Sequence, residues 1–110
     1  TFILQATKEV PRRLMNERRK TIGLRVPDFA ITQAMLSELH APVMSTSLIL
    51  PGNAVPESDP EEIAEKIGKS VDMIVDGGVL PAEPTTVIDM ADGEIKVLRE
   101  GSGDPAPFLA

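Results

Sequence analysis

Residues 21–39 read TIGLRVPDFAITQAMLSEL, and this stretch joins a strand pattern to a helix pattern. Apolar residues alternate with small or charged ones over residues 21–26, which predicts a strand with one apolar face. Pro27 ends the predicted strand, and Asp28 is the predicted N-cap of a helix that runs to about residue 39. That helix carries an apolar stripe spaced by four residues, made of Ile31, Met35 and Leu39. A stripe of this kind predicts a helix that packs against a sheet.

Strand and helix patterns continue on both sides of this stretch. The predicted strands lie at residues 1–6, 44–50, 71–75, 85–90 and 94–99, and the further helices at 10–16 and 59–67. Asp59 followed by Pro60 is the clearest helix start, and Gly68 is the predicted stop. The last two strands form a hairpin around residues 91–93, and residues 101–110 are predicted to be an irregular tail. The order of elements predicts a mixed α/β (α+β) fold, a twisted mixed sheet flanked by helices.

Composition limits the class of protein. The chain has 110 residues, 42% of them hydrophobic and 25% charged, which is enough for one domain. The absence of cysteine excludes disulfides and thiolate metal sites and is typical of a reducing compartment, so we expect a cytoplasmic location. No apolar run approaches the roughly 20 residues that cross a bilayer, so no membrane partner is expected. His40 is the only histidine, which leaves no His/Cys metal site and favours a surface or capping role for that residue.

The charges are distributed unevenly. Residues 1–27 contain seven basic and two acidic residues, whereas the remainder contains four basic and fifteen acidic ones. A basic segment on an acidic body is consistent with a phosphate-bearing partner such as RNA, although solvated surface charges explain the pattern better on charge alone. The candidate RNA-binding residues are Arg12, Arg13, Arg18, Arg19 and Lys20.

Polar residues interrupt several of the predicted strands. They are Arg25, the run Ser45-Thr46-Ser47, the pair Thr85-Thr86, and Arg99. Burying unpaired hydroxyl or guanidinium groups is costly, so each needs a partner or a solvent-filled cleft. Each also has an ordinary explanation, because threonine is a good strand former and arginine can extend from a sheet edge. Together they predict one pocket in which guanidinium and hydroxyl groups receive a carboxylate or phosphate.

Several strings occur together in the order seen in one family. They are residues 21–27 (TIGLRVP), 45–47 (STS) with Pro51-Gly52 after them, 84–89 (PTTVID) and 97–101 (VLREG). In this respect the chain resembles the YrdC-like proteins, which are the threonylcarbamoyl-adenylate synthases and their paralogues. Residues 9–14 (EVPRRL) and 19–23 (RKTIG) are similar to the YciO branch of that family. The resemblance covers essentially the whole chain but only the carboxy-terminal half of the family's domain.

The resemblance implies an incomplete YrdC/RibB-like fold with an open, positively lined cavity. In the synthases that cavity takes ATP with Mg, threonine and bicarbonate as substrates and yields threonylcarbamoyl-adenylate for a tRNA modification. By position, Arg25 resembles the arginine that holds the amino-acid carboxylate, and Thr85 the hydroxyl near the amino acid. Thr21 and Arg99 resemble residues near the nucleotide, while Ser45 and Ser47 resemble a wall that meets threonine and phosphate. We further expect the amino-terminal half of the domain as a missing partner, because residues 1–6 already have core-quality sequence.

Two departures keep a second function open. The synthases carry Ser-Ala-Asn where this chain has Ser47-Leu48-Ile49, so an amide is replaced by an alkyl group that cannot bond a phosphate. The family's Lys-x-Arg motif and its Pro-Thr-Asp-Thr-like strand lie upstream of the residues present, so no turnover is expected from this chain alone. The alternatives are a nucleotide- and amino-acid-binding enzyme domain, a non-catalytic paralogue that binds nucleotide, double-stranded RNA or tRNA, and a purely structural fragment.

Overall fold

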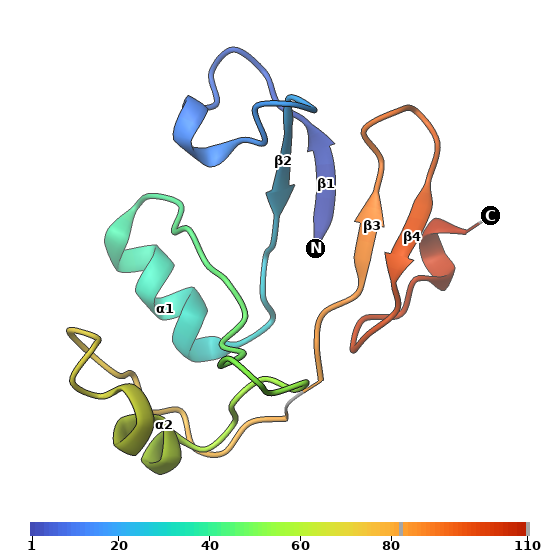
Figure 1. The fold of residues 1–110 in the computed structure, drawn as a ribbon. Coiled ribbons are helices and arrows are strands. Elements are labelled where there is room, and N and C mark those ends of the chain that lie inside the picture. Colours follow the sequence, from blue (N-terminus) through green and yellow to red (C-terminus); the bar gives the residue numbers. More distant parts are fainter. Residues whose placement is uncertain (82, 110) are drawn as a thin grey trace. The chain divides into compact units, whose positions relative to one another are not determined.

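The computed structural model describes residues 1–81 and 83–109, and it divides into two compact units. The first unit consists of Thr1–Met44 together with Thr85–Ala110, and the second of Ser45–Pro84. The sheet and the helix α1 belong to the first unit, and the helix α2 belongs to the second (Figure 1). The predicted mixed α/β class is confirmed.

The first unit is built on a four-stranded mixed sheet. Its strands are β1 (Phe2–Gln5), β2 (Thr21–Leu24), β3 (Val87–Asp89) and β4 (Lys96–Arg99). They lie in the order β2-β1-β3-β4, with β1 parallel to β3 and the two outer pairs antiparallel. The two central strands come from opposite ends of the sequence and are joined by backbone bonds, such as the one from Met90 N to Ile3 O at 2.9 Å.

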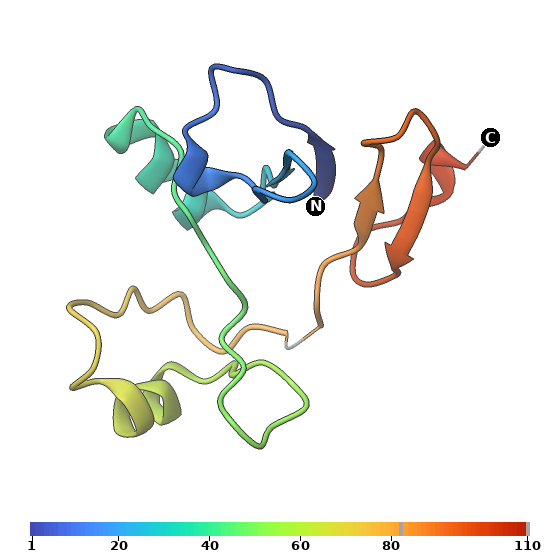
Figure 2. The ribbon, with the colours of Figure 1, turned by 45° about the horizontal axis from the view of Figure 1, so that its top comes forward.

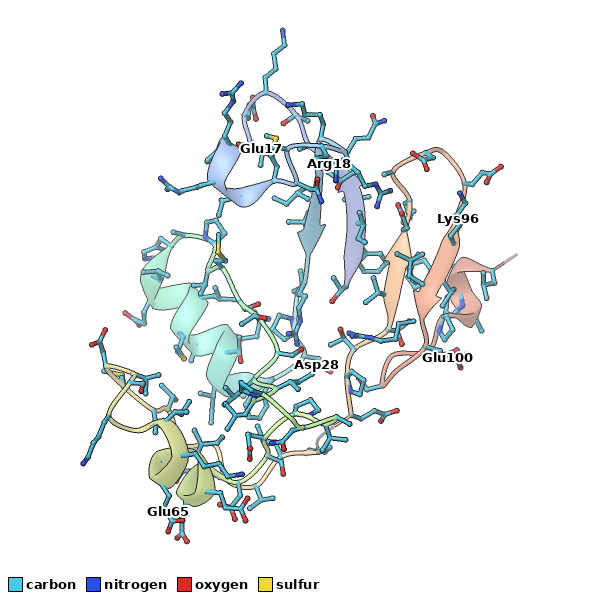
Figure 3. The ribbon with its side chains drawn as sticks, viewed as in Figure 1. Glu17, Arg18, Asp28, Glu65, Lys96 and Glu100 are labelled. Atoms are coloured by element: carbon cyan, nitrogen blue, oxygen red, sulfur yellow. The ribbon has the colours of Figure 1, made fainter. Side chains whose placement is uncertain are left out.

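The register defines which residues share each end of the sheet. Phe2 pairs with Leu24 on one side and with Ile88 on the other, and Val87 pairs with Arg99. The start of β1, the end of β2, the start of β3 and the end of β4 therefore meet at one end. The opposite end holds the turn into β2, the end of β3 and the start of β4, as the positions of Arg18 and Lys96 show (Figure 3).

The core of this unit lies along β3. Among the described residues, Ile88, Ala91 and Pro105 are buried apolar residues, and Thr21, Thr86 and Asp89 are buried polar ones. Thr86 uses its hydroxyl to bind the chain after β4, because Oγ1 donates to Gly103 O and accepts from Gly101 N. Hydrogen bonds of buried polar side chains therefore help to hold this unit together, in addition to the burial of its apolar residues.

The carboxy-terminal tail is more ordered than the sequence predicted. It contains a 3-10 turn, η2 (Ala106–Phe108), which lies beside β4 in both ribbon views (Figures 1 and 2). The Phe108 ring meets Phe2 edge to face, with centroids 5.2 Å apart. This geometry is favourable for an aromatic pair and holds the tail against the sheet.

The two helices predicted in the first unit lie where they were expected, but the type of one and the N-cap of the other differ from the prediction. Instead of a helix at residues 10–16 there is a 3-10 turn, η1 (Arg12–Leu14). The helix α1 (Ala30–Leu39) ends where predicted, but Phe29 and not Asp28 precedes its first residue, so the predicted N-cap is wrong by one position. The exposed His40 follows the helix in a left-handed conformation, with φ of 54°, and its backbone N donates to Leu36 O.

The predicted burial of the α1 stripe is not found. No residue of α1 is buried, and Met35 and Leu39 are 51% and 55% exposed. Ala34, Met35, Leu39 and Val43 instead line an open apolar groove of about 570 Å³ together with Glu38. The spacing of four correctly predicted a helix with an apolar face, but not what would cover that face.

The second unit contains the best-predicted helix and two wrong strand predictions. In α2 (Pro60–Ile67) the Asp59 carboxylate accepts from Glu61 N at 2.9 Å, and Gly68 follows the last residue. Lys66 Nζ lies 2.8 Å from Glu57 Oε1. Neither 44–50 nor 71–75 forms a strand. A strand needs a hydrogen-bonded neighbour, and the second unit offers none within residues 45–81 and 83–84.

Candidate anion-binding site

Three of the predicted ligand-binding residues gather at one end of the sheet. Arg25 follows β2, Thr85 precedes β3, and Arg99 ends β4. The strand register brings these positions to the end where β1 begins, at Thr1. We call this set, Thr1, Arg25, Thr85 and Arg99, the arginine end of the sheet.

The side chains at the arginine end are joined by hydrogen bonds centred on Thr85. Arg99 Nε donates to Thr85 O at 2.8 Å, and Arg99 Nη2 donates to Thr85 Oγ1 at 3.1 Å. The Thr85 hydroxyl also lies 3.0 Å from Thr1 Oγ1. Arg99 therefore holds both the backbone and the side chain of Thr85, which fixes the guanidinium plane against the sheet.

Arg25 contributes a second positive charge at the same place. Arg25 directly follows the end of β2, and Arg99 is the last residue of β4, so the strand register places both at the end of the sheet where β1 begins. The backbone N of Thr1 donates to Thr86 O at 2.8 Å, which fixes Thr1 in the sheet. Two like charges at one end of the sheet create a positive potential there.

The guanidinium groups at the arginine end have no acidic partner among residues 1–81 and 83–109. Each ion pair within 4.0 Å in that part of the chain involves other residues, namely Arg19 with Asp89, Lys66 with Glu57, and Lys96 with Glu94. Asp28 and Glu100 are neighbours in sequence but form no ion pair with Arg25 or Arg99 in the described structure. Both guanidinium groups are exposed, so an anion from solution can reach them.

The opposite end of the sheet presents a contrasting arginine. Arg19 Nη2 lies 2.9 Å from Asp89 Oδ2, and the Asp89 side chain is only 8% exposed. Asp89 Oδ1 also accepts from Ala91 N at 3.0 Å. The Ala91 bond and the Arg19 bond together hold the pKa of the Asp89 carboxyl below its usual range. We call Arg19 and Asp89 the ion-paired end; it ties the β1–β2 turn to β3, 70 positions away in sequence.

The other predicted RNA-binding residues remain exposed on the segment before β2. Arg12, Arg13, Arg18 and Lys20 form no ion pair within the described residues, in contrast to Arg19. The backbone at Arg18 and Arg19 is ordered by Asn16, whose Oδ1 accepts from Arg18 N and Arg19 N at 3.0 and 3.1 Å. The segment thus presents several cations on a defined turn.

Not every predicted ligand residue lies at the arginine end. Thr21 is buried and pairs with Gln5, at the opposite end of β2 from Arg25. Ser45 and Ser47 are exposed and belong to the second unit. Ile49, at the position of the family asparagine, is 46% exposed.

Sequence reasoning missed two residues that the structure brings into these sites. Thr1 was assigned to a strand and given no chemical role, although its hydroxyl contacts Thr85. Asp89 was given no role of its own within the predicted strand at 85–90, whereas it is buried and paired. The only available signal for Asp89 was an acidic residue between two apolar ones in that predicted strand.

The structure provides few further donor sets for a cofactor. Within residues 1–81 and 83–109 there is no cluster of three or more histidine or acidic side chains placed to hold a metal ion. In the same part of the chain, no helix combines the length and the apolar character that a membrane crossing demands.

The fold and the arginine end describe a mixed α/β domain with exposed cations at one edge of its central sheet. The family model named Sua5_yciO_yrdC, described as "Telomere recombination", matches residues 1–101. The chain belongs to this family.

Individual relatives agree with the family match. The chain is similar to "Uncharacterized protein YciO" of Escherichia coli K12, with 59% identity over 99% of this chain and 53% of the relative. A protein of Haemophilus influenzae is 54% identical over 99% of this chain and 53% of its own length. The crystal structure of E. coli YciO superposes with a TM-score of 0.90 at 58% identity, covering 98% of this chain and 52% of the other. The chain spans about half the length of the curated relatives it matches.

Proposed function

We propose that the arginine end binds the anionic part of a nucleotide or of a threonine-like amino acid. The observation that carries this proposal is that Arg25 and Arg99 lie at one end of the sheet, with Arg99 bound to Thr85, and that neither has an acidic partner in the described residues. Guanidinium groups are suited to this task because their donors match the oxygen geometry of phosphate and carboxylate.

The two arginines have different roles in this proposal. Arg99 is held by Thr85 and presents a fixed charge, whereas no hydrogen bond holds the Arg25 side chain among the described residues. A fixed group and an adaptable one together can receive a ligand without a large rearrangement of the sheet. Ser45 and Ser47, which belong to the second unit, stay ligand-contacting residues proposed on the family resemblance alone.

The experiment is a titration of the chain with Mg·ATP and, separately, with threonine, followed by calorimetry or NMR. Arg99→Gln should weaken binding at least tenfold, because one charge-assisted hydrogen bond contributes about 1.5–3 kcal/mol. The matched control is Lys96→Gln, which removes one positive charge from the other end of the same strand. Equal losses in both variants would show a general charge effect and contradict a site at the arginine end.

In the complete protein we propose that this site serves synthesis of threonylcarbamoyl-adenylate from ATP, threonine and bicarbonate in tRNA modification, in the cytoplasm. The support is family membership together with the cations that would neutralise the phosphates. Ile49 argues against ordinary synthase chemistry. Pyrophosphate release by a full-length relative, compared with a no-enzyme control, tests this: no release above the control would contradict it.

A second candidate function is non-catalytic binding of double-stranded RNA or tRNA by the segment before β2. The exposed cations Arg12, Arg13, Arg18 and Lys20 favour it, because they have no ion pair in the described chain. Arg19 is assigned a structural role in this proposal, since it holds Asp89. An unpaired cluster on an ordered turn can release counterions from a phosphate backbone.

The RNA proposal is tested by the salt dependence of binding. Each cation that contacts a phosphate adds about 0.7–0.9 to the slope of log affinity against log salt. Arg18→Gln should therefore weaken RNA binding and reduce that slope, whereas Lys69→Gln, an exposed lysine of the second unit, should change neither. An unchanged slope in Arg18→Gln and in the quadruple variant of all four cations would contradict the proposal.

A further inference from the structure

Thr1 is the fourth polar residue of the arginine end, and its backbone is hydrogen-bonded to β3 and the residue before it. Its backbone N donates to Thr86 O at 2.8 Å, and its carbonyl accepts from Ile88 N at 2.9 Å. These bonds on both sides of the residue leave its Cα little freedom. A side chain on such a position is presented in a defined direction.

The two branches of the Thr1 side chain face different neighbours. The methyl carbon Cγ2 faces Gly23 of β2, 3.9 Å from where a Cβ atom there would lie. The hydroxyl is on the other branch, 3.0 Å from Thr85 Oγ1 before β3. A β-branched side chain has few χ1 rotamers, so this orientation is one of a small set.

The direction of the hydrogen bonds leaves one hydrogen unused. Arg99 can only donate, so Thr85 Oγ1 is the acceptor of the bond from Nη2. The contact between the Thr1 and Thr85 hydroxyls uses one of their two hydrogens, whichever group donates. The other hydrogen has no acceptor among the described residues. The network therefore ends in a donor beside the Arg99 guanidinium, at the end of the sheet that also carries Arg25.

We propose that Thr1 is a ligand-contacting residue, and that the Thr1–Thr85 hydroxyl pair donates its free hydrogen to an oxygen of the anion held by Arg25 and Arg99. This inference rests on the proposed function of the arginine end and adds a residue to it. Accepting from Arg99 polarises the Thr85 hydroxyl, which makes the pair a better donor to a negatively charged oxygen. A phosphate and a carboxylate both supply such an oxygen.

The test compares Thr1→Val with Thr1→Ser. Valine keeps the methyl contact with Gly23 and removes the hydroxyl, whereas serine keeps the hydroxyl. Titrations use inorganic pyrophosphate and acetate as probes for the phosphate and the carboxylate source. Thr1→Val should weaken binding of the preferred probe about tenfold, as expected for one hydrogen bond to a charged acceptor, and Thr1→Ser should stay within about threefold of the original chain.

Each outcome has a defined meaning. Original affinity in Thr1→Val, or an equal loss in Thr1→Ser, would overturn the role of the Thr1 hydroxyl while leaving the proposed function intact. Binding of neither probe by the original chain would overturn both. Thr85→Val is a second variant that keeps the backbone bonds and removes the other hydroxyl, and it should lose at least as much affinity as Thr1→Val.

Discussion

Both ends of the central sheet carry arginine. At one end the arginine forms an ion pair with a carboxylate, and at the other end the arginines have no acidic partner among the described residues. At the ion-paired end, Arg19 meets a carboxylate that is 8% exposed. At the arginine end, Arg99 meets only a hydroxyl and a carbonyl of Thr85, and Arg25 adds a like charge. The position of an arginine in the sequence does not show whether it is paired with a carboxylate, because Arg19, Arg25 and Arg99 all lie at or near the ends of strands.

This contrast indicates a division between stability and binding. A guanidinium that is paired with a carboxylate has its charge compensated within the fold, and removing one partner leaves the other without compensation. A guanidinium that bonds only neutral groups keeps its full charge for a ligand. The ion-paired end should therefore govern stability, and the arginine end should govern anion binding.

The largest expected effect is at the arginine end. Substituting both Arg25→Gln and Arg99→Gln should weaken pyrophosphate binding about 100-fold, because two charge-assisted hydrogen bonds are lost. Stability should fall by no more than about 2 kcal/mol, the contribution of the two bonds from Arg99 to neutral acceptors. Calorimetric titration and thermal melting of the same sample measure the two quantities. If the double variant bound pyrophosphate with an affinity within threefold of the original chain, the arginine end would not govern anion binding.

At the ion-paired end the same pair of measurements should give the reverse result. Asp89→Ala leaves Arg19 and the Ala91 amide without their acceptor, so the melting temperature should drop clearly. Pyrophosphate affinity should stay within about threefold in the fraction that is folded. A stable variant with lost binding would assign Asp89 to the ligand site instead.

A weaker effect is expected from pH. The folded-state pKa of Asp89 is lowered, so its contribution to stability is complete above the ordinary carboxyl pKa and is lost as pH falls through the folded-state value. Thermal melting between neutral and acidic pH should show this decline. In Asp89→Asn the decline should be shallower, and an identical pH profile would show that another group is responsible.

The smallest effect is expected for Lys96, which shares a strand with Arg99. Its contact with Glu94 is 3.7 Å long, and the two side chains are 52% and 76% exposed. Exposed pairs of this kind contribute little, so Lys96→Gln should change stability by less than about 0.5 kcal/mol. A larger loss of stability in a melting experiment would mean that this exposed ion pair stabilises the fold as much as the pair made by the buried Asp89 carboxylate.

Local features of the fold were predictable from the sequence, and long-range ones were not. The Asp59 cap and the hairpin around residues 91–93 were predicted correctly, because capping and turn chemistry depend on adjacent residues. The strand predictions at 44–50 and 71–75 failed because a strand also needs a neighbour, which local pattern does not reveal.

The sites show the same limit. The family strings pointed to Arg25, Thr85 and Arg99, which the strand register brings to one end. Arg19 was grouped with its basic neighbours, since its partner Asp89 lies 70 positions away and no local rule connects them. Thr1 was overlooked because threonine at a strand start is ordinary, and its contact with Thr85 spans 84 positions.

The most direct test of the difference between the two ends is an NMR titration with pyrophosphate that follows the Nε–H signals of the arginines. The signals of Arg25 and Arg99 should shift with a common affinity, while the signal of Arg19 should stay in place because its guanidinium is bound to Asp89. Equal shifts for Arg19, or unmoved signals for Arg25 and Arg99, would contradict the account.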